Sequence, residues 1–199
     1  RIFVTGHTVS VGGTSAGTIN ITGKETTITT ANGVVNISGG NGCQNTVTTA
    51  NAKVVMTGAN NTVTSAAGTV YATGVNTITT ANGTVNASGI NTITTANGTV
   101  NVTGHANTIT TNQGNVWMSG STATVTNAAG GDIYLTGNSS TVTNADGGRI
   151  FITGAGATVQ TSQGTLNITG SNNTVTTAEG TVNASGINTI TTAQGTVNM

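Results

Sequence analysis

Apolar and polar residues alternate along most of this chain. In the segment 83–97, GTVNASGINTITTAN, Val85 and Ala87 alternate with polar residues, and Ile93 lies between two threonines. Successive side chains of a β-strand point to opposite faces, so a period of two predicts strands with one apolar face. The segment therefore predicts two short strands joined by tight turns at glycine and asparagine residues.

Variants of this segment fill the whole chain. Copies of 15 to 19 residues begin at Arg1, Gly17, Gly33, Ala52, Gly68, Gly83, Gly98, Gly114, Gly131, Gly148, Gly164 and Gly180, with a partial copy from Gly195. A repeat of this length cannot bury its own apolar face and must stack on its neighbours. We therefore expect an all-β fold, a flattened parallel β-solenoid (β-helix) of about 12 coils with two short strands per coil. Residues 1–199 are expected to form a single domain without separate caps, with the extra residues of longer copies in the turns.

About three apolar side chains per coil are expected to point inward. The first strand supplies pairs such as Ile19 and Ile21, and the second strand supplies one residue, such as Ile28, or Val9 in the first copy. Two inward polar columns are expected at the ends of the second strand, where buried amides and hydroxyls must find partners. The asparagine column comprises Asn45, Asn61, Asn76, Asn91, Asn107, Asn173 and Asn188, and the threonine column comprises Thr30, Thr49, Thr80, Thr95, Thr111, Thr161, Thr177 and Thr192.

The second strand is expected to present the most regular outer face, formed by Thr-X-Thr pairs. The pairs are Thr27 and Thr29, Thr46 and Thr48, Thr62 and Thr64, Thr77 and Thr79, Thr92 and Thr94, Thr108 and Thr110, Thr124 and Thr126, Thr141 and Thr143, Thr174 and Thr176, and Thr189 and Thr191. Two copies depart from the pattern, with Thr8 and Ser10 in one and Thr158 and Gln160 in the other.

This array resembles the ice-binding face of the β-solenoid antifreeze proteins, a flat array of Thr-X-Thr on stacked coils. The resemblance implies that these threonines contact ice. A purely structural role is the alternative, because threonine favours strands and pairs with threonine across them.

The outer column of the first strand is less uniform and includes aromatic residues. Trp117, Tyr134 and Phe151 occupy equivalent positions in three consecutive copies, and Tyr71 occupies the same position earlier in the chain. An exposed aromatic stripe on an otherwise polar protein typically marks a contact surface. We expect lateral association with another subunit there, in preference to carbohydrate stacking, because no polar or acidic groups converge around the stripe.

Charge and composition argue against several functions. Only 4% of residues are charged, and the net charge is zero, so the chain has no basic stripe for nucleic acid or an anionic membrane surface. No apolar run is long enough for membrane insertion. Asp132 and Arg149 are expected to form an ion pair across adjacent coils, and the acidic residues are too scattered for a catalytic groove. We therefore expect no enzymatic activity, no cofactor and no metal. Cys43 is the single cysteine and is expected to be a small residue in a turn insertion.

The two ends of the chain have matching strand patterns. Arg1, Ile2, Phe3 and Val4 begin a first strand, and Val197, Asn198 and Met199 lie at the same position of a later copy. Because open strand edges pair readily, head-to-tail stacking of subunits is expected to generate a filament. The favoured interpretation is a secreted or cell-surface structural protein that self-assembles into the fibres of a matrix, sheath or surface appendage. The alternatives are an ice-binding protein that uses the threonine array, and a fragment of an adhesin or tail-fibre shaft.

Overall fold

The computed structural model describes residues 1–7, 10–13, 17–39 and 44–199. Its architecture is the predicted one, an all-β parallel β-solenoid of about 12 coils. The chain divides into two compact units, Arg1–Thr99 and Val100–Met199. The expectation of a single domain stays a prediction. Thr8, Val9 and Cys43 lie outside the described residues, so the structure does not test what the sequence predicted for them.

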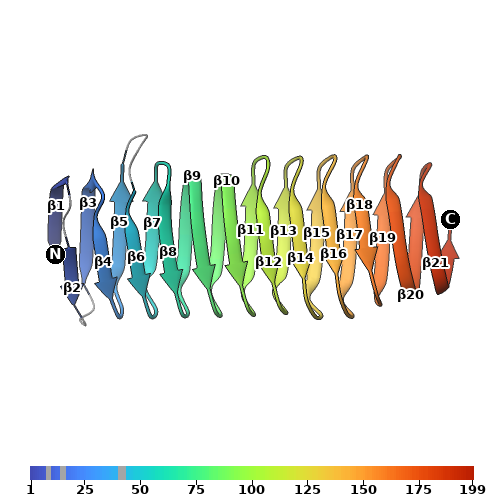
Figure 1. The fold of residues 1–199 in the computed structure, drawn as a ribbon, viewed down its shortest axis with the longest axis horizontal. Coiled ribbons are helices and arrows are strands. Elements are labelled where there is room, and N and C mark those ends of the chain that lie inside the picture. The colour runs from blue at the N-terminus through green and yellow to red at the C-terminus, as the bar shows by residue number, and fades with distance from the viewer. Residues whose placement is uncertain (8–9, 14–16, 40–43) are drawn as a thin grey trace. The chain divides into compact units, whose positions relative to one another are not determined.

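The first unit stacks parallel strands in register (Figure 1). Its strands are β1 (Ile2–His7), β2 (Ser10–Gly13), β3 (Thr18–Lys24), β4 (Thr27–Thr30), β5 (Val34–Ser38), β6 (Thr46–Thr49), β7 (Lys53–Thr57), β8 (Asn61–Ser65), β9 (Thr69–Thr80) and β10 (Thr84–Thr95). The first strands of the coils pair in the order β1, β3, β5, β7 and β9, and the second strands pair as β2, β4, β6, β8 and β9. The long strands β9 and β10 pair along their whole length, with Val85 beside Val70 and Ile93 beside Ile78.

The second unit repeats this arrangement. Its strands are β11 (Thr99–Thr103), which begins at the boundary, β12 (Thr108–Thr111), β13 (Asn115–Ser119), β14 (Thr124–Asn127), β15 (Asp132–Thr136), β16 (Thr141–Asn144), β17 (Arg149–Thr153), β18 (Thr158–Thr161), β19 (Thr165–Thr169), β20 (Thr174–Ser185) and β21 (Thr189–Asn198). First strands β13, β15, β17, β19 and β20 pair in sequence, as do second strands β12, β14, β16, β18 and β20. Strand β21 pairs with β20.

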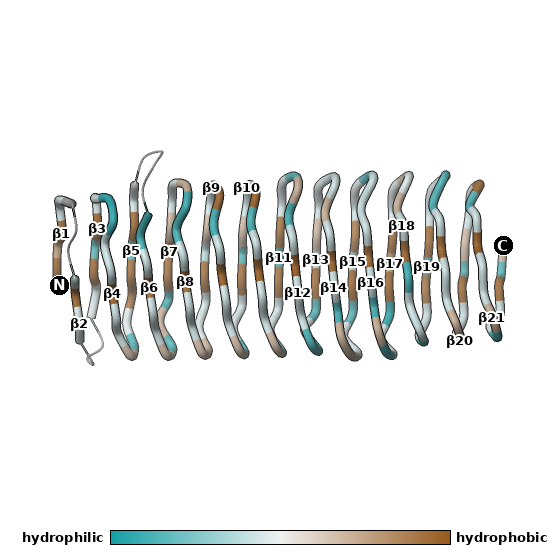
Figure 2. The backbone as a smooth tube through the Cα atoms, viewed as in Figure 1, coloured by the Kyte–Doolittle hydropathy of each residue, from teal (hydrophilic) through white to brown (hydrophobic). Residues whose placement is uncertain are grey.

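The predicted inward apolar residues form the core of each unit. Ile28, Val47 and Val63 are fully buried, and hydrophobic positions recur at matching levels of successive coils (Figure 2). In the first coil, Val11 lies beside Ile28.

Buried asparagines form hydrogen-bonded ladders, as the sequence predicted. Nδ2 of Asn45, Asn61 and Asn76 each donates to Oδ1 of the asparagine on the next coil, at 3.0, 3.0 and 3.2 Å. In the second unit Asn173 donates to Asn188 at 2.9 Å. In the second unit the column begins with the buried Asn107 and continues with the small residues Ala123, Ser140 and Ala157, all buried, before it reaches Asn173. Each ladder satisfies polar groups that would be costly to bury without partners.

The type of residue that ends the second strand of a coil depends on the length of the turn that follows. Where three residues separate the strands, the second strand ends at threonine or, in β8, at serine, and Thr161 Oγ1 donates to the carbonyl of Gln163 at 2.8 Å. Where four residues separate them, asparagine takes its place. Nδ2 of Asn144 donates to the carbonyl of Gly147 at 2.5 Å, and Asn127 makes the equivalent contact in the preceding coil. The longer amide side chain reaches one residue further than the hydroxyl, a pairing that the sequence analysis missed.

Two kinds of corner, the link between the strands of one coil, explain most of the remaining differences in length. At a short corner Val75 alone separates Gly74, with φ of 105°, from the inward Asn76, and the strand continues through the link. At a long corner two residues intervene, and the second has left-handed φ, as Asn60 does at 62°. A coil with a short corner and a three-residue turn has 15 residues, such as 83–97, and a long corner or a longer turn adds one residue each.

Candidate functional site

The outward threonines of the second strands form a continuous surface within the first unit, which we call the threonine face. Thr64 lies beside Thr79, which in turn lies beside Thr94, so each coil adds one member to each of two parallel rows. All the predicted pairs of this unit are exposed, while the residues between and beside them are buried. These pairs are Thr27 and Thr29, Thr46 and Thr48, Thr62 and Thr64, Thr77 and Thr79, and Thr92 and Thr94, at the predicted positions.

The second unit carries its own threonine face with one interruption. The pairs that point outward as predicted are Thr108 and Thr110, Thr124 and Thr126, Thr141 and Thr143, Thr174 and Thr176, and Thr189 and Thr191. Thr110 lies beside Thr126, and Thr126 lies beside Thr143 on the following coil. Thr110 and Thr126 are exposed, but Thr143 is only half-buried, and its next neighbour is Gln160, whose longer side chain breaks this row. The threonine rows of this face are therefore regular except at Gln160.

Each threonine face offers a neutral, repetitive array of hydroxyl and methyl groups. Neighbouring members of a row are separated by the strand spacing of roughly 4.8 Å, and the two rows by roughly 6.6 Å, twice the rise per residue. A hydroxyl both donates and accepts hydrogen bonds, and the β-branched side chain restricts its rotamers. Such an array can order water or pair with a second regular surface.

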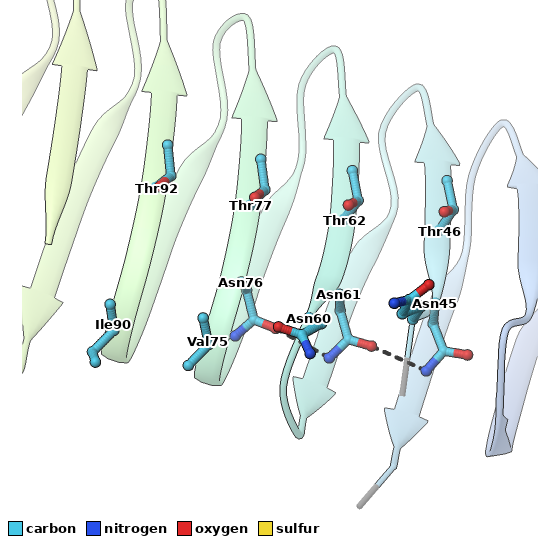
Figure 3. Close-up of a pocket in the computed structure, with 11 residues that line it drawn as sticks. Asn45, Thr46, Asn60, Asn61, Thr62, Val75, Asn76, Thr77, Ile90 and Thr92 are labelled. Carbon is cyan, nitrogen blue, oxygen red and sulfur yellow. Dashed lines mark hydrogen bonds between the residues drawn. The ribbon is translucent and has the colours of Figure 1, made fainter. Parts of the chain in front are cut away.

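A groove of about 500 Å³ follows one edge of the threonine face in the first unit (Figure 3). Thr46, Thr62, Thr77 and Thr92 stand in line along one side of it, one on each coil. Val75 and Ile90 lie at the corners on the other side, where they are 43% and 50% exposed. The sequence analysis did not single out this corner groove. The sequence feature that marks this groove is the apolar residue that follows glycine at each short corner.

Three aromatic rings form a ridge on the outer face of the first strands in the second unit. The centroids of Trp117 and Tyr134 are 5.3 Å apart and those of Tyr134 and Phe151 are 4.7 Å apart, with interplanar angles of 4° and 2°. We call these three residues the aromatic ridge. Because the neighbouring rings cover both faces of Tyr134, the middle of the ridge offers no open ring face on which a sugar could stack. Tyr71 is not part of this stack. It lies in the first unit under Lys53 Nζ, which is 5.2 Å from its ring centroid.

The predicted ion pair borders the aromatic ridge. Arg149 Nε donates to Asp132 Oδ1 at 3.1 Å, and a second Arg149 nitrogen contacts Asp132 Oδ2. The hydrogen bond and the negative charge of Asp132 raise the pKa of Arg149. Both residues lie on adjacent paired strands, so the two charges compensate each other beside the rings. An exposed pair of this kind contributes little to stability.

The remaining charged residues do not gather into a site. Glu179 accepts a hydrogen bond from Gln163 Nε2 at 3.3 Å. Within the described ranges, no group of three or more His, Cys, Asp and Glu side chains is placed to hold a metal ion. A search of the same residues for a helix long and apolar enough to cross a membrane found none.

The residues predicted to form the assembly ends lie on β1 and near the end of the chain. Ile2 and Phe3 are 45% and 73% exposed, whereas Val4 is buried. On β21, Val197 lies beside Val182, and Asn198 Nδ2 donates to Asn183 Oδ1 at 2.8 Å. Arg1 and Met199 are exposed.

The fold and its threonine-rich strands define a β-solenoid repeat protein. Comparisons with family models, with curated proteins and with solved structures gave no match.

Proposed function

We propose that this protein is a non-enzymatic, extracellular structural protein that self-assembles into filaments by stacking coils of one copy on coils of another. One observation carries the proposal: the same coil sequence stacks on different neighbours in the same register. The segments 83–96 and 180–193 are identical. The first stacks on β9 with Thr84 beside Thr69, and the second begins beside Thr165 of β19.

The interchangeability of coils has a physical basis. Stacking depends on backbone hydrogen bonds, which every residue of this proline-free chain can make, and on columns of similar side chains that tolerate small differences. The chain also has few charges that would repel a second copy. A coil of one molecule is therefore a suitable neighbour for a coil of another. Such a contact joins two different edges, does not close on itself and propagates into a filament.

Filaments of this kind suit a matrix, sheath or surface appendage, and the alternative is a fragment of an adhesin or tail-fibre shaft. The partner in each case is the protein itself. Export tests the extracellular part of the proposal: the protein is expected in the culture medium or on the cell surface, and its retention inside the cell would contradict that part.

Electron microscopy of the purified 199-residue chain tests assembly. We expect filaments at micromolar concentration. Val197→Lys, which adds a charge to a half-buried position of β21, is expected to yield discrete particles, whereas Thr196→Lys, at an exposed position of the same strand, is expected to leave filaments intact. Discrete particles from the unmodified chain at all concentrations would refute self-assembly.

A second candidate function, ice binding, is favoured by the threonine face. Its support is the pairing of exposed threonines in two rows on successive coils. The matching variants are Thr92→Tyr, which places a bulky ring on this face, and Asn86→Tyr, which places it on the other outer face of the same coil beside Tyr71. If the protein binds ice, only Thr92→Tyr abolishes thermal hysteresis. Equal hysteresis in both variants would exclude the threonine face.

A further inference from the structure

We infer that the aromatic ridge of one copy docks into an apolar groove on the first unit of a second copy. This inference rests on the proposed self-association and deepens it, because it names the two surfaces of the lateral contact. The groove lies on the outer face of β1, β3, β5 and β7 and has a volume of about 350 Å³. We call it the outer groove.

The outer groove exists because the central column of these strands carries mostly short side chains. Asn20 and Asn36 are joined by a hydrogen bond, in which Nδ2 of Asn36 donates to Oδ1 of Asn20 at 2.8 Å. Val55 continues the column, and Phe3, 73% exposed, stands at the other end. The neighbouring column of threonine and serine, which includes Ser38, completes the lining, and no lining residue is charged.

The aromatic ridge matches the outer groove in spacing. Its rings come from successive coils and are 5.3 and 4.7 Å apart. The strands that line the groove are parallel and hydrogen-bonded, so their spacing is the usual 4.7–4.9 Å or so. Each ring can therefore occupy the same position over successive coils of the partner. A second copy of this chain supplies that spacing along its whole stack, whereas an unrelated flexible peptide would have to be ordered to supply it.

The two surfaces also match in polarity. The ridge is apolar apart from the Tyr134 hydroxyl and the Trp117 indole nitrogen, which can meet the amides and hydroxyls along the groove. Asp132 and Arg149 lie beside the ridge, where Arg149 also contacts the ring of Phe151. These two charges are already paired with each other. Docking therefore buries no lone charge. Two ridges facing each other would leave their flanks uncovered, whereas a ridge in a groove covers them.

The contact is small and gains strength by repetition. A fully buried aromatic side chain covers about 150–250 Å², and Trp117 is 40% exposed, so three rings alone stay well below the area of about 1,000 Å² that a stable interface needs. Between two filaments, however, the same contact recurs in every copy. Linked weak contacts bind far more tightly than a single one.

Cysteine cross-linking with a short bis-maleimide tests the docking, in a Cys43→Ser background. Ser38→Cys marks the outer groove, and Thr136→Cys marks the strand of Tyr134 without removing a ring; both positions are exposed. We expect a cross-linked dimer when the two variants are mixed. The control mixture pairs Thr136→Cys with Thr79→Cys, which lies on the threonine face. The additional change Tyr134→Asn is expected to reduce the dimer yield severalfold.

Three outcomes would overturn the docking: no cross-linked dimer in the mixture, an equal yield from Thr136→Cys alone, which indicates ridge against ridge, or an equal yield in the control mixture. Electron microscopy of the same samples separates this inference from the proposed function. Filaments without the cross-link refute only the groove as the lateral contact. Absence of both filaments and cross-links refutes self-assembly as well.

Discussion

Replacing Asn76 by alanine tests whether the buried amide ladder stabilises the stack. Asn76 is 3% exposed. Its Nδ2 donates to Asn91 Oδ1 at 3.2 Å and to the carbonyl of Thr73 at 3.3 Å, and its Oδ1 accepts from Asn61 at 3.0 Å. Asn76→Ala removes all three hydrogen bonds and takes a ladder partner away from an asparagine on each adjacent coil.

The expected loss follows from the number of buried groups affected. Removing one partner of a buried hydrogen bond costs about 1–3 kcal/mol for the group left behind. Two ladder partners are affected, so we expect Asn76→Ala to lower the free energy of unfolding by about 2–6 kcal/mol. That is a large share of the roughly 5–15 kcal/mol that stabilises a typical domain.

The assay is urea denaturation combined with hydrogen exchange of the amides in β8, β9 and β10, because a repeat protein can open locally. Thr77→Ala is the matched control. It removes an exposed hydroxyl from the next residue of the same strand and is expected to cost less than about 1 kcal/mol. Equal, small losses in both variants would show that the ladder contributes nothing beyond the packing of the coils.

Three further predictions concern the turns, the corners and the core, each measured by urea denaturation. Asn144→Thr and deletion of Gly147 are each expected to lower the free energy of unfolding by about 1–3 kcal/mol. The double variant is expected to lose clearly less than the sum of the two, because the shorter side chain then fits the shorter turn. Additive losses would contradict this. In Gly74→Ala, the new Cβ would lie 2.1 Å from a carbonyl oxygen of the preceding coil. This variant is expected to destabilise more than Gly130→Ala, whose Cβ meets nothing within 4 Å and which costs about 1–2 kcal/mol for its left-handed φ. The reverse order would refute the importance of close corner stacking. Ile93→Ala should cost about 2–5 kcal/mol by leaving a cavity in the core, and a loss below about 1 kcal/mol would mean that the coil collapses around it.

Several site positions followed from the sequence with little ambiguity. Thr92 and Thr94 point outward and Ile93 inward, because a period of two fixes the face of every residue once one apolar residue is assigned to the core. The pairing of Asp132 with Arg149 followed from their equivalent positions in adjacent copies. These features depend only on local alternation and on the register between repeats, and both can be read from the chain.

Other features required coordinates of neighbouring coils. The sequence analysis did not indicate that Val11 lies beside Ile28. Asn144 stands where most coils have threonine, and the structural reason is that its amide donates to the carbonyl of Gly147.

The sequence by itself determined the coil, its inward and outward residues and the columns that they form, because these follow from periodicity. The tertiary structure decided the shape of the surfaces. The face-to-face stacking of Trp117, Tyr134 and Phe151, the exposure of Val75 and Ile90, and the groove that Val75 and Ile90 line depend on the directions of side chains across several coils. Those directions are set by contacts between residues that are 15 or more positions apart in the chain, and a local pattern does not contain them.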